Sequence, residues 1–125
     1  LDHTSGVVIQ DPTMQRRTMA TFARVWQDAP APPQWWSYPG CSPRLENSAT
    51  GLRFSGDASG LWPVGRYLEL LLGELPRLLD NPQGYGPNGK DFIAHVDFPR
   101  DVSAAWQCLR ADTLLSQALN ARTLG

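Results

Sequence analysis

The chain has 125 residues, of which 42% are hydrophobic and 18% are charged, and its formal net charge is −1. This length fits one domain, residues 1–125, built around one core. A nearly neutral chain has no broad electrostatic field, so we predict that it binds neither nucleic acid nor an anionic membrane. Charged residues interrupt its most apolar stretch, which is too short for a membrane span.

The cysteines and the first residues bear on cellular location. Cys41 and Cys108 lack the spacing of metal ligands, and we expect both thiols to be free and reduced. The apolar run at 7–9 is too short for a signal peptide. These features predict a cytoplasmic protein. Because the sequence opens with Leu1 and not with Met, residues 1–13 are expected to be disordered or foreign to the natural chain.

The first half of the chain predicts a helix followed by an extended segment. Asp11 and Pro12 suit the start of a helix over residues 12–27, whose arginines lie largely off the apolar stripe and are expected to be solvated. Residues 29–43 contain five prolines, which exclude a helix or a central strand. Three large aromatic residues lie in that segment: Trp35, Trp36 and Tyr38. They form either a binding platform or a lid that seals the core.

The middle of the chain predicts a hairpin and a long helix. Two short strands joined by turn residues are predicted between residues 45 and 54. The leucines of residues 64–79 keep one apolar face over about four turns. Pro76 is expected to kink or split this helix. Tyr67 and Leu70 widen its apolar face, which suggests a second packing surface such as a symmetric interface.

Residues 91–98 carry the clearest strand signal, because apolar and polar side chains alternate. One face would carry Phe92, Ala94, Val96 and Phe98. The other would carry Asp91, Ile93, His95 and Asp97. The apolar side should pack on the leucine-lined helix, and a last helix, capped by Asp101, should follow. The prediction is an α+β fold: a small antiparallel sheet of three to four strands with about three helices packed on one face.

Residues 84–90 read G-Y-G-P-N-G-K, which superficially matches a phosphate-binding loop. That mechanism needs a strand before the loop and a helix after it, and the predicted order here is reversed. Asp91 stands where a Ser or Thr would hold magnesium. The segment is therefore interpreted as an irregular surface loop, with Tyr85 at its tip placed to touch a ligand or partner.

His95 and Asp97 are predicted to share one face of a strand, where the carboxylate could orient the imidazole for acid–base chemistry. No nucleophile or second base is marked beside them, so they stay candidates and no catalytic residue is assigned. A polar, half-exposed sheet face explains the same pattern. Clustered metal ligands are missing from the sequence, and no metal or cofactor is predicted.

Two functional classes follow from this pattern. The first is a small protein-binding module, such as an inhibitor, an immunity-type protein, an adaptor or a chaperone, which binds another protein or a second copy of itself. Its contact residues would be Trp35, Trp36, Tyr38 and Tyr85. The lack of a reaction motif favours this class over an enzyme. The alternative is a small-molecule binding protein or small enzyme with a pocket beside His95 and Asp97.

Overall fold

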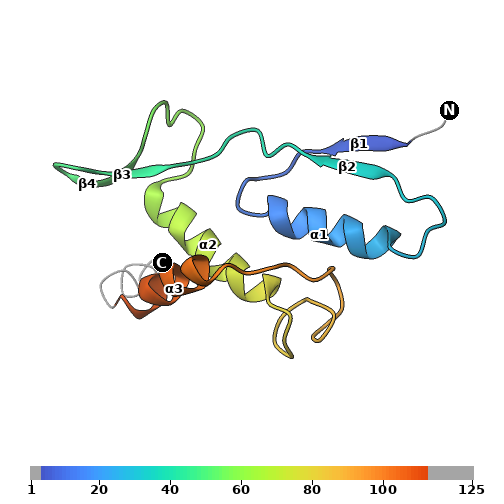
Figure 1. Ribbon diagram of the computed structural model, residues 1–125. Helices are drawn as coiled ribbons and strands as arrows, with labels where there is room; N and C mark the ends of the chain where they lie inside the picture. Colours follow the sequence, from blue (N-terminus) through green and yellow to red (C-terminus); the bar gives the residue numbers. More distant parts are fainter. Residues whose placement is uncertain (1–3, 113–125) are drawn as a thin grey trace.

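The computed structural model describes residues 4–112. Its elements, in chain order, are β1 (Ser5–Val8), α1 (Gln15–Trp26), β2 (Gln34–Ser37), β3 (Leu45–Ser48), β4 (Gly51–Phe54), α2 (Val64–Leu78) and α3 (Arg100–Ala111). Figure 1 shows α1 beneath the β1–β2 sheet at one end, the β3–β4 hairpin at the other, and α2 and α3 between them. The predicted α+β class, with three helices and four short strands, is confirmed.

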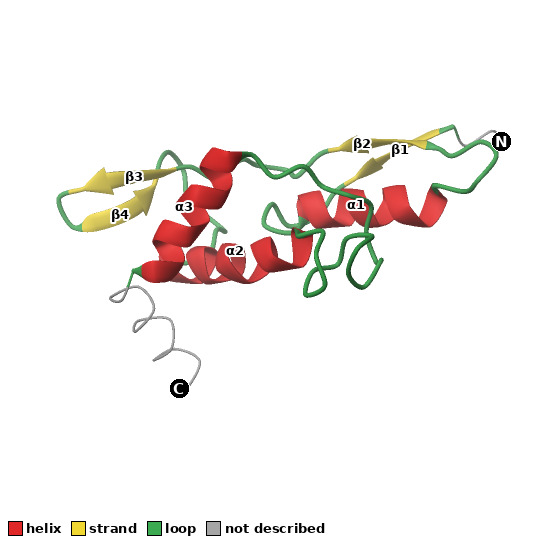
Figure 2. Ribbon diagram, turned by 60° about the horizontal axis from the view of Figure 1, so that its bottom comes forward, coloured by secondary structure: helices red, strands yellow, loops and turns green. Residues whose placement is uncertain are grey.

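The strands form two separate sheets of two strands each, so the prediction of a single antiparallel sheet is wrong (Figure 2). The β3–β4 pair is the predicted antiparallel hairpin. In contrast, β1 and β2 pair in parallel, with Val7 opposite Trp36, because the chain crosses through α1 between them. Prolines on both sides of β2 keep that strand short, since proline cannot donate to a ladder.

The predicted strand at residues 91–98 is also wrong, because the segment pairs with none of the strands formed by residues 4–112. Asp91 adopts a left-handed φ of 57°, and the amides of Phe92 and Ile93 both donate to the carbonyl of Tyr85. Because of this turn, the side chains of residues 92 and 93 exchange the faces that they would have in a regular strand. As a result Ile93 is 1% exposed and Phe92 is 56% exposed, the reverse of the prediction.

The core lies where α1, α2 and the segment after α2 meet. Its buried centre consists of Ala20, Leu78 and Ile93. Partly buried side chains that pack against this centre are Leu75, Tyr85, Val96 and Phe98. The predicted packing of the leucine-lined helix against the 91–98 segment is therefore confirmed, although Phe92 takes no part in this cluster.

α1 begins at Gln15, later than the sequence predicts. The carboxylate of Asp11 accepts hydrogen bonds from the amide and the hydroxyl of Thr13, and the Asp11 carbonyl accepts the amide of Met14. Asp11 therefore caps a turn that precedes the helix. The helix starts only after this turn has ended.

α2 continues through Pro76 to Leu78 and is not split there. Because proline has no N–H, the carbonyl of Leu72, four residues earlier, loses its usual helical donor. Trp106 of α3 donates its indole N–H to this carbonyl at 3.4 Å. α3 thus supplies the hydrogen bond that the proline removes from α2.

We expect Trp106→Phe to lower the free energy of unfolding by about 1–2 kcal/mol, because Leu72 loses a donor and the indole loses packing. In a Pro76→Ala background the new amide at position 76 can donate to Leu72, so the loss should be smaller. Urea unfolding of the two single variants and the double variant measures this coupling. Equal losses in the two backgrounds would show that the indole acts through packing alone.

The widened apolar face of α2 packs inside the chain at Tyr67. The ring of Tyr67 lies edge-on to Phe54, with centroids 5.3 Å apart, and stacks on Trp62 at 5.5 Å. Burial raises the pKa of the Tyr67 hydroxyl. The hairpin and the start of α2 are thereby joined by aromatic contacts, and Tyr67 needs no second copy of the chain to cover it.

Candidate functional site

The aromatic residues of the proline-rich segment are divided between the two faces of the β1–β2 sheet. Trp35 points toward α1, where its ring lies 4.8 Å from that of Phe22 and 6.2 Å from that of Trp26. Trp36 and Tyr38 lie on the opposite face and are 57% and 60% exposed. Trp35 thus seals the interior, whereas Trp36 and Tyr38 are open to contact.

Trp35 fixes the position of β2 against β1. Its ring lies over Gly6, where an added Cβ would be 2.6 Å from the nearest ring carbon. Only glycine leaves room for the indole at this point. The indole nitrogen of Trp35 is buried without a hydrogen-bond partner, so packing holds the ring in place. The sheet is therefore a fixed support for the side chains on its outer face.

The outer face of the β1–β2 sheet is apolar. Val7 is the register partner of Trp36. The amide of Tyr38 donates to the carbonyl of Val8 and extends the pairing, so strand alternation places Ile9 and Tyr38 on the same face. We call these four side chains the outer-face cluster: Val7, Ile9, Trp36 and Tyr38. All four are between 57% and 71% exposed. Contiguous exposed apolar side chains of this kind commonly mark binding surfaces.

No charged residue surrounds the outer-face cluster in sequence. Residues 4–10, which contain β1, and residues 29–43, which contain β2, include no Asp, Glu, Lys or Arg. The other sheet differs, because Arg53 donates to Glu46 across the β3–β4 hairpin at 2.8 Å. Centres of protein–protein interfaces are depleted in charge and enriched in Trp and Tyr. The outer face of β1–β2 has this composition and the hairpin does not.

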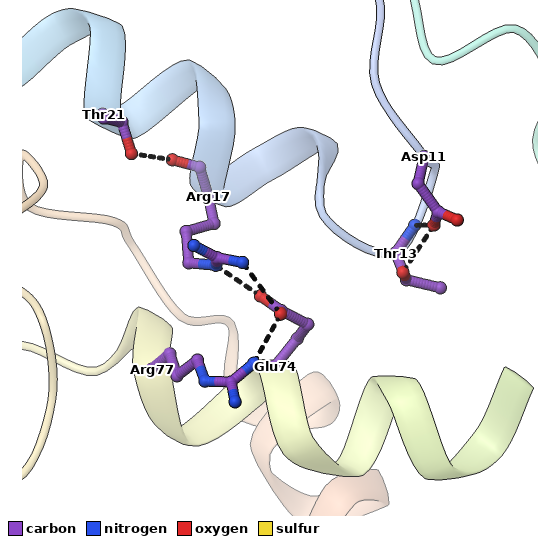
Figure 3. Close-up of polar contacts among 6 residues, drawn as sticks. All are labelled: Asp11, Thr13, Arg17, Thr21, Glu74 and Arg77. Carbon is purple, nitrogen blue, oxygen red and sulfur yellow. Dashed lines mark hydrogen bonds and ion pairs between the residues drawn. The ribbon is translucent and has the colours of Figure 1, made fainter. Parts of the chain in front are cut away.

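A buried carboxylate fixes α1, the support of this sheet, to α2 (Figure 3). Glu74 is 2% exposed and accepts two hydrogen bonds from Arg17, at 2.6 and 3.1 Å, and one from Arg77 at 2.8 Å. The hydrogen bond to Glu74 raises the pKa of Arg17. The expectation that the arginines of this helix are solvated is therefore wrong for Arg17.

Arg24, near the end of α1, makes a second ion pair that the sequence did not suggest. Its guanidinium donates to both carboxylate oxygens of Asp91, at 3.0 and 2.9 Å. This contact lowers the pKa of Asp91 and raises that of Arg24. Asp91 is the residue with the left-handed φ, so the ion pair joins α1 to the turn that directs Ile93 into the core.

The loop at residues 84–90 has no free amide with which to hold a phosphate. Each backbone N–H from Gly84 to Asp91 donates to an acceptor within the chain, and Pro87 has none to offer. A phosphate-binding loop must direct such N–H groups at its ligand. Tyr85 is not at an exposed tip, since it packs against the core and lies edge-on to Phe92.

His95 lies between two carboxylates. Its Nδ1 is 2.7 Å from Asp80 Oδ2, and its Nε2 is 3.2 Å from Asp97 Oδ1. The hydrogen bond to Asp80 is the main cause of a raised pKa for His95, and Asp97 adds to it. Asp80 also accepts the amide of Asn88 at 2.6 Å, which is the main cause of its own lowered pKa. Sequence reasoning found Asp97 but missed Asp80, which is 15 positions from His95.

This arrangement favours a structural role for His95. The imidazole is 57% exposed, and a cavity of about 410 Å³ that Asp97 borders does not include His95 in its wall. Through Asp80, His95 connects the 84–90 loop to the segment that carries Ile93. We interpret these contacts as hydrogen bonds that hold the loop in position. The acid–base role of His95 and Asp97 stays a prediction.

We expect the His95 imidazole to titrate above its ordinary pKa of about 6.5, because the folded state favours its charged form. The stability that this provides is complete below about pH 6.5 and is lost as the pH rises through the raised folded-state pKa. Asp80→Asn should lower the pKa of His95 more than Asp97→Asn does. An NMR titration of the three proteins measures this, and a folded-state pKa at or below the ordinary value would contradict it.

The chain matches no protein-family model. Within residues 4–112, no group of three or more His, Cys, Asp or Glu side chains is arranged to hold a metal ion. Over the same range, none of the helices combines the length and apolar character needed to cross a bilayer. Cys41 and Cys108 are both exposed and unbridged.

Proposed function

We propose that this chain is a protein-binding module and that the outer-face cluster of the β1–β2 sheet is its contact surface. The observation that carries the proposal is the set of four exposed apolar side chains on one sheet face, within two segments that contain no charge. Nucleic acids and anionic lipids are bound through basic residues, which this face lacks. The partner that fits is a protein with an apolar, weakly charged surface.

Trp36 and Tyr38 are the expected anchors of the contact. Both side chains carry large rings on few rotatable bonds, so they lose little conformational entropy when they are buried. Tryptophan and tyrosine are also enriched among the residues that dominate binding energies. The backbone that carries them is already fixed by Trp35 beneath the sheet and by prolines on both sides of β2. A preordered surface of this kind loses little entropy when it binds.

The proposal is tested by comparing three forms of the chain as bait in extracts of the cells that express it. These are the native chain, the double variant Trp36→Ser/Tyr38→Ser, and Phe92→Ser as a matched control. Phe92 is nearly as exposed as Trp36 but belongs to neither sheet, and its ring contacts Tyr85. We expect one protein to bind the native chain and the control in stoichiometric amounts and to be lost with the double variant.

The purified partner then allows a quantitative measurement. Truncation of two anchors should raise the dissociation constant by at least 100-fold, since a single anchor typically contributes about 2 kcal/mol or more. Phe92→Ser should change it by less than about threefold. Equal affinity for the native chain and the double variant, with both folded, would refute the proposed surface.

A further inference from the structure

Among the strands of the described chain, β1 has a neighbour on one side only. The amide of Tyr38 donates to the carbonyl of Val8, so the even-numbered residues of β1 direct their backbone groups toward β2. Because backbone groups alternate in direction along a strand, the odd-numbered residues direct their N–H and C=O groups to the other edge. These residues are Ser5, Val7 and Ile9. Within residues 4–112 no backbone group pairs with that edge. The edge is a row of unpaired donors and acceptors.

This edge lacks the devices that normally prevent strands from pairing. Exposed edges usually carry a charge, a proline or a bulge. Residues 4–10 contain neither a charge nor a proline, whereas β2 lies between Pro33 and Pro39 and the hairpin carries the pair Glu46–Arg53. Of the strand edges in the described chain, that of β1 is therefore the one left unprotected by charge or proline.

We propose that a second copy of this chain pairs with the free edge of β1, so that the two β1 strands run antiparallel about a two-fold axis at Val7. In this register Val7 exchanges two backbone hydrogen bonds with Val7 of the other copy. Ser5 pairs in the same way with Ile9 of the other copy, and Ile9 pairs with Ser5 of the other copy. All outward backbone groups of the three residues are then satisfied, and the two small sheets become one sheet of four strands.

The features of the edge favour a second copy as its occupant. An isologous contact requires a surface that complements itself, and an uncharged strand with Val at its centre meets no repulsion from an identical strand. The helix beneath the sheet does not obstruct the edge, because α1 packs under β2 through Trp35 and Phe22. β1 lies at the border of the molecule, as Figure 1 shows.

The pairing is independent of the proposed protein partner. It uses backbone groups at the edge of the sheet, whereas the partner contacts side chains on its outer face. Dimerisation would place two outer-face clusters side by side on one surface, so that a partner with two sites could bind both. The variant Trp36→Ser/Tyr38→Ser separates the two proposals, since it should keep the dimer and lose the partner.

The test combines sedimentation equilibrium with NMR on the full chain. We expect a reversible dimer whose population rises with concentration. In a mixture of ¹³C-labelled and unlabelled chains, an intermolecular contact is expected between the Hα atoms of Gly6 and Val8. In the proposed register these residues face each other across the two strands, with Cα atoms about 4.5 Å apart, whereas within one strand they are about 7 Å apart.

Three substitutions of Val7 make the test specific. Val7→Pro removes an outward N–H and leaves the β2 ladder intact, and Val7→Lys places two ammonium groups opposite each other. Both should weaken self-association at least tenfold, and Val7→Thr should not. Should Val7→Pro fail to fold, Val7→Lys decides, because its backbone is unchanged. A native chain that stays monomeric at millimolar concentration, or a dimer that persists in Val7→Lys or lacks the Gly6–Val8 contact, would overturn the proposal.

Discussion

Ile93→Ala should lower the free energy of unfolding by about 2–5 kcal/mol, the range for an isoleucine removed from a closed core. Ile93 is 1% exposed and lies between Ala20 of α1 and Leu78 of α2. The substitution leaves a cavity at the place where both helices meet the 91–98 segment. Domains of this size are stable by only about 5–15 kcal/mol, so a large share of the stability depends on this one side chain.

The neighbouring residue provides the control. Phe92 has the larger side chain but is 56% exposed, so Phe92→Ala should lower the free energy of unfolding by less than about 1 kcal/mol. Urea unfolding of both variants, with unchanged m-values, measures the difference. A simple alternating strand would reverse the order of the two losses. That outcome would show that the turn at Asp91 does not exist in solution.

Arg17→Ala is expected to lower the free energy of unfolding by about 2–3 kcal/mol. The substitution leaves Glu74, which is 2% exposed, with Arg77 as its remaining charged partner. Breaking a fully buried ion pair typically costs about 3–5 kcal/mol. The expected loss is smaller because Arg17 is itself partly exposed and the second ion pair persists. Thermal or urea unfolding measures the loss.

Arg53→Ala is the matched control for that prediction. Arg53 also pairs with a glutamate at 2.8 Å, but both side chains of the Arg53–Glu46 pair are exposed. Exposed pairs contribute little, so the loss should be below about 1 kcal/mol. A double-mutant cycle on Arg17 and Glu74 isolates their interaction from the lost packing of the arginine stem. If Arg17→Ala and Arg53→Ala were equally mild, the Glu74 contact would not be the anchor of α1.

Patterns in the sequence identified the elements that are stabilised by contacts between residues close in the chain. The leucine spacing predicts α2, and the turn residues predict the β3–β4 hairpin, because both depend on neighbours along the chain. The strand predicted at residues 91–98 is not formed. Alternation shows that a chain is extended and half-buried, but a strand also needs a free edge beside it. The left-handed turn at Asp91, which exchanges the roles of Phe92 and Ile93, leaves no clear mark in the sequence.

The candidate site could be predicted only in part. Trp36 and Tyr38 were recognised as unusual, but their separation from Trp35 follows from a register that the sequence does not reveal. Val7 and Ile9 were not proposed as contact residues, because residues 1–13 were expected to be disordered, whereas the structure has β1 at Ser5–Val8. One available signal was missed, namely that two distant segments, 4–10 and 29–43, both lack charge.

The most direct test of the proposed contact surface is photo-crosslinking in the cells that express the chain. A photoreactive phenylalanine analogue, p-benzoylphenylalanine, is placed at position 36 in one form and at position 92 in another, two sites of nearly equal exposure. We predict a discrete crosslinked protein from position 36 and none from position 92. Crosslinking that is absent at position 36, or the same at both positions, would contradict the assignment of the β1–β2 outer face as the binding surface.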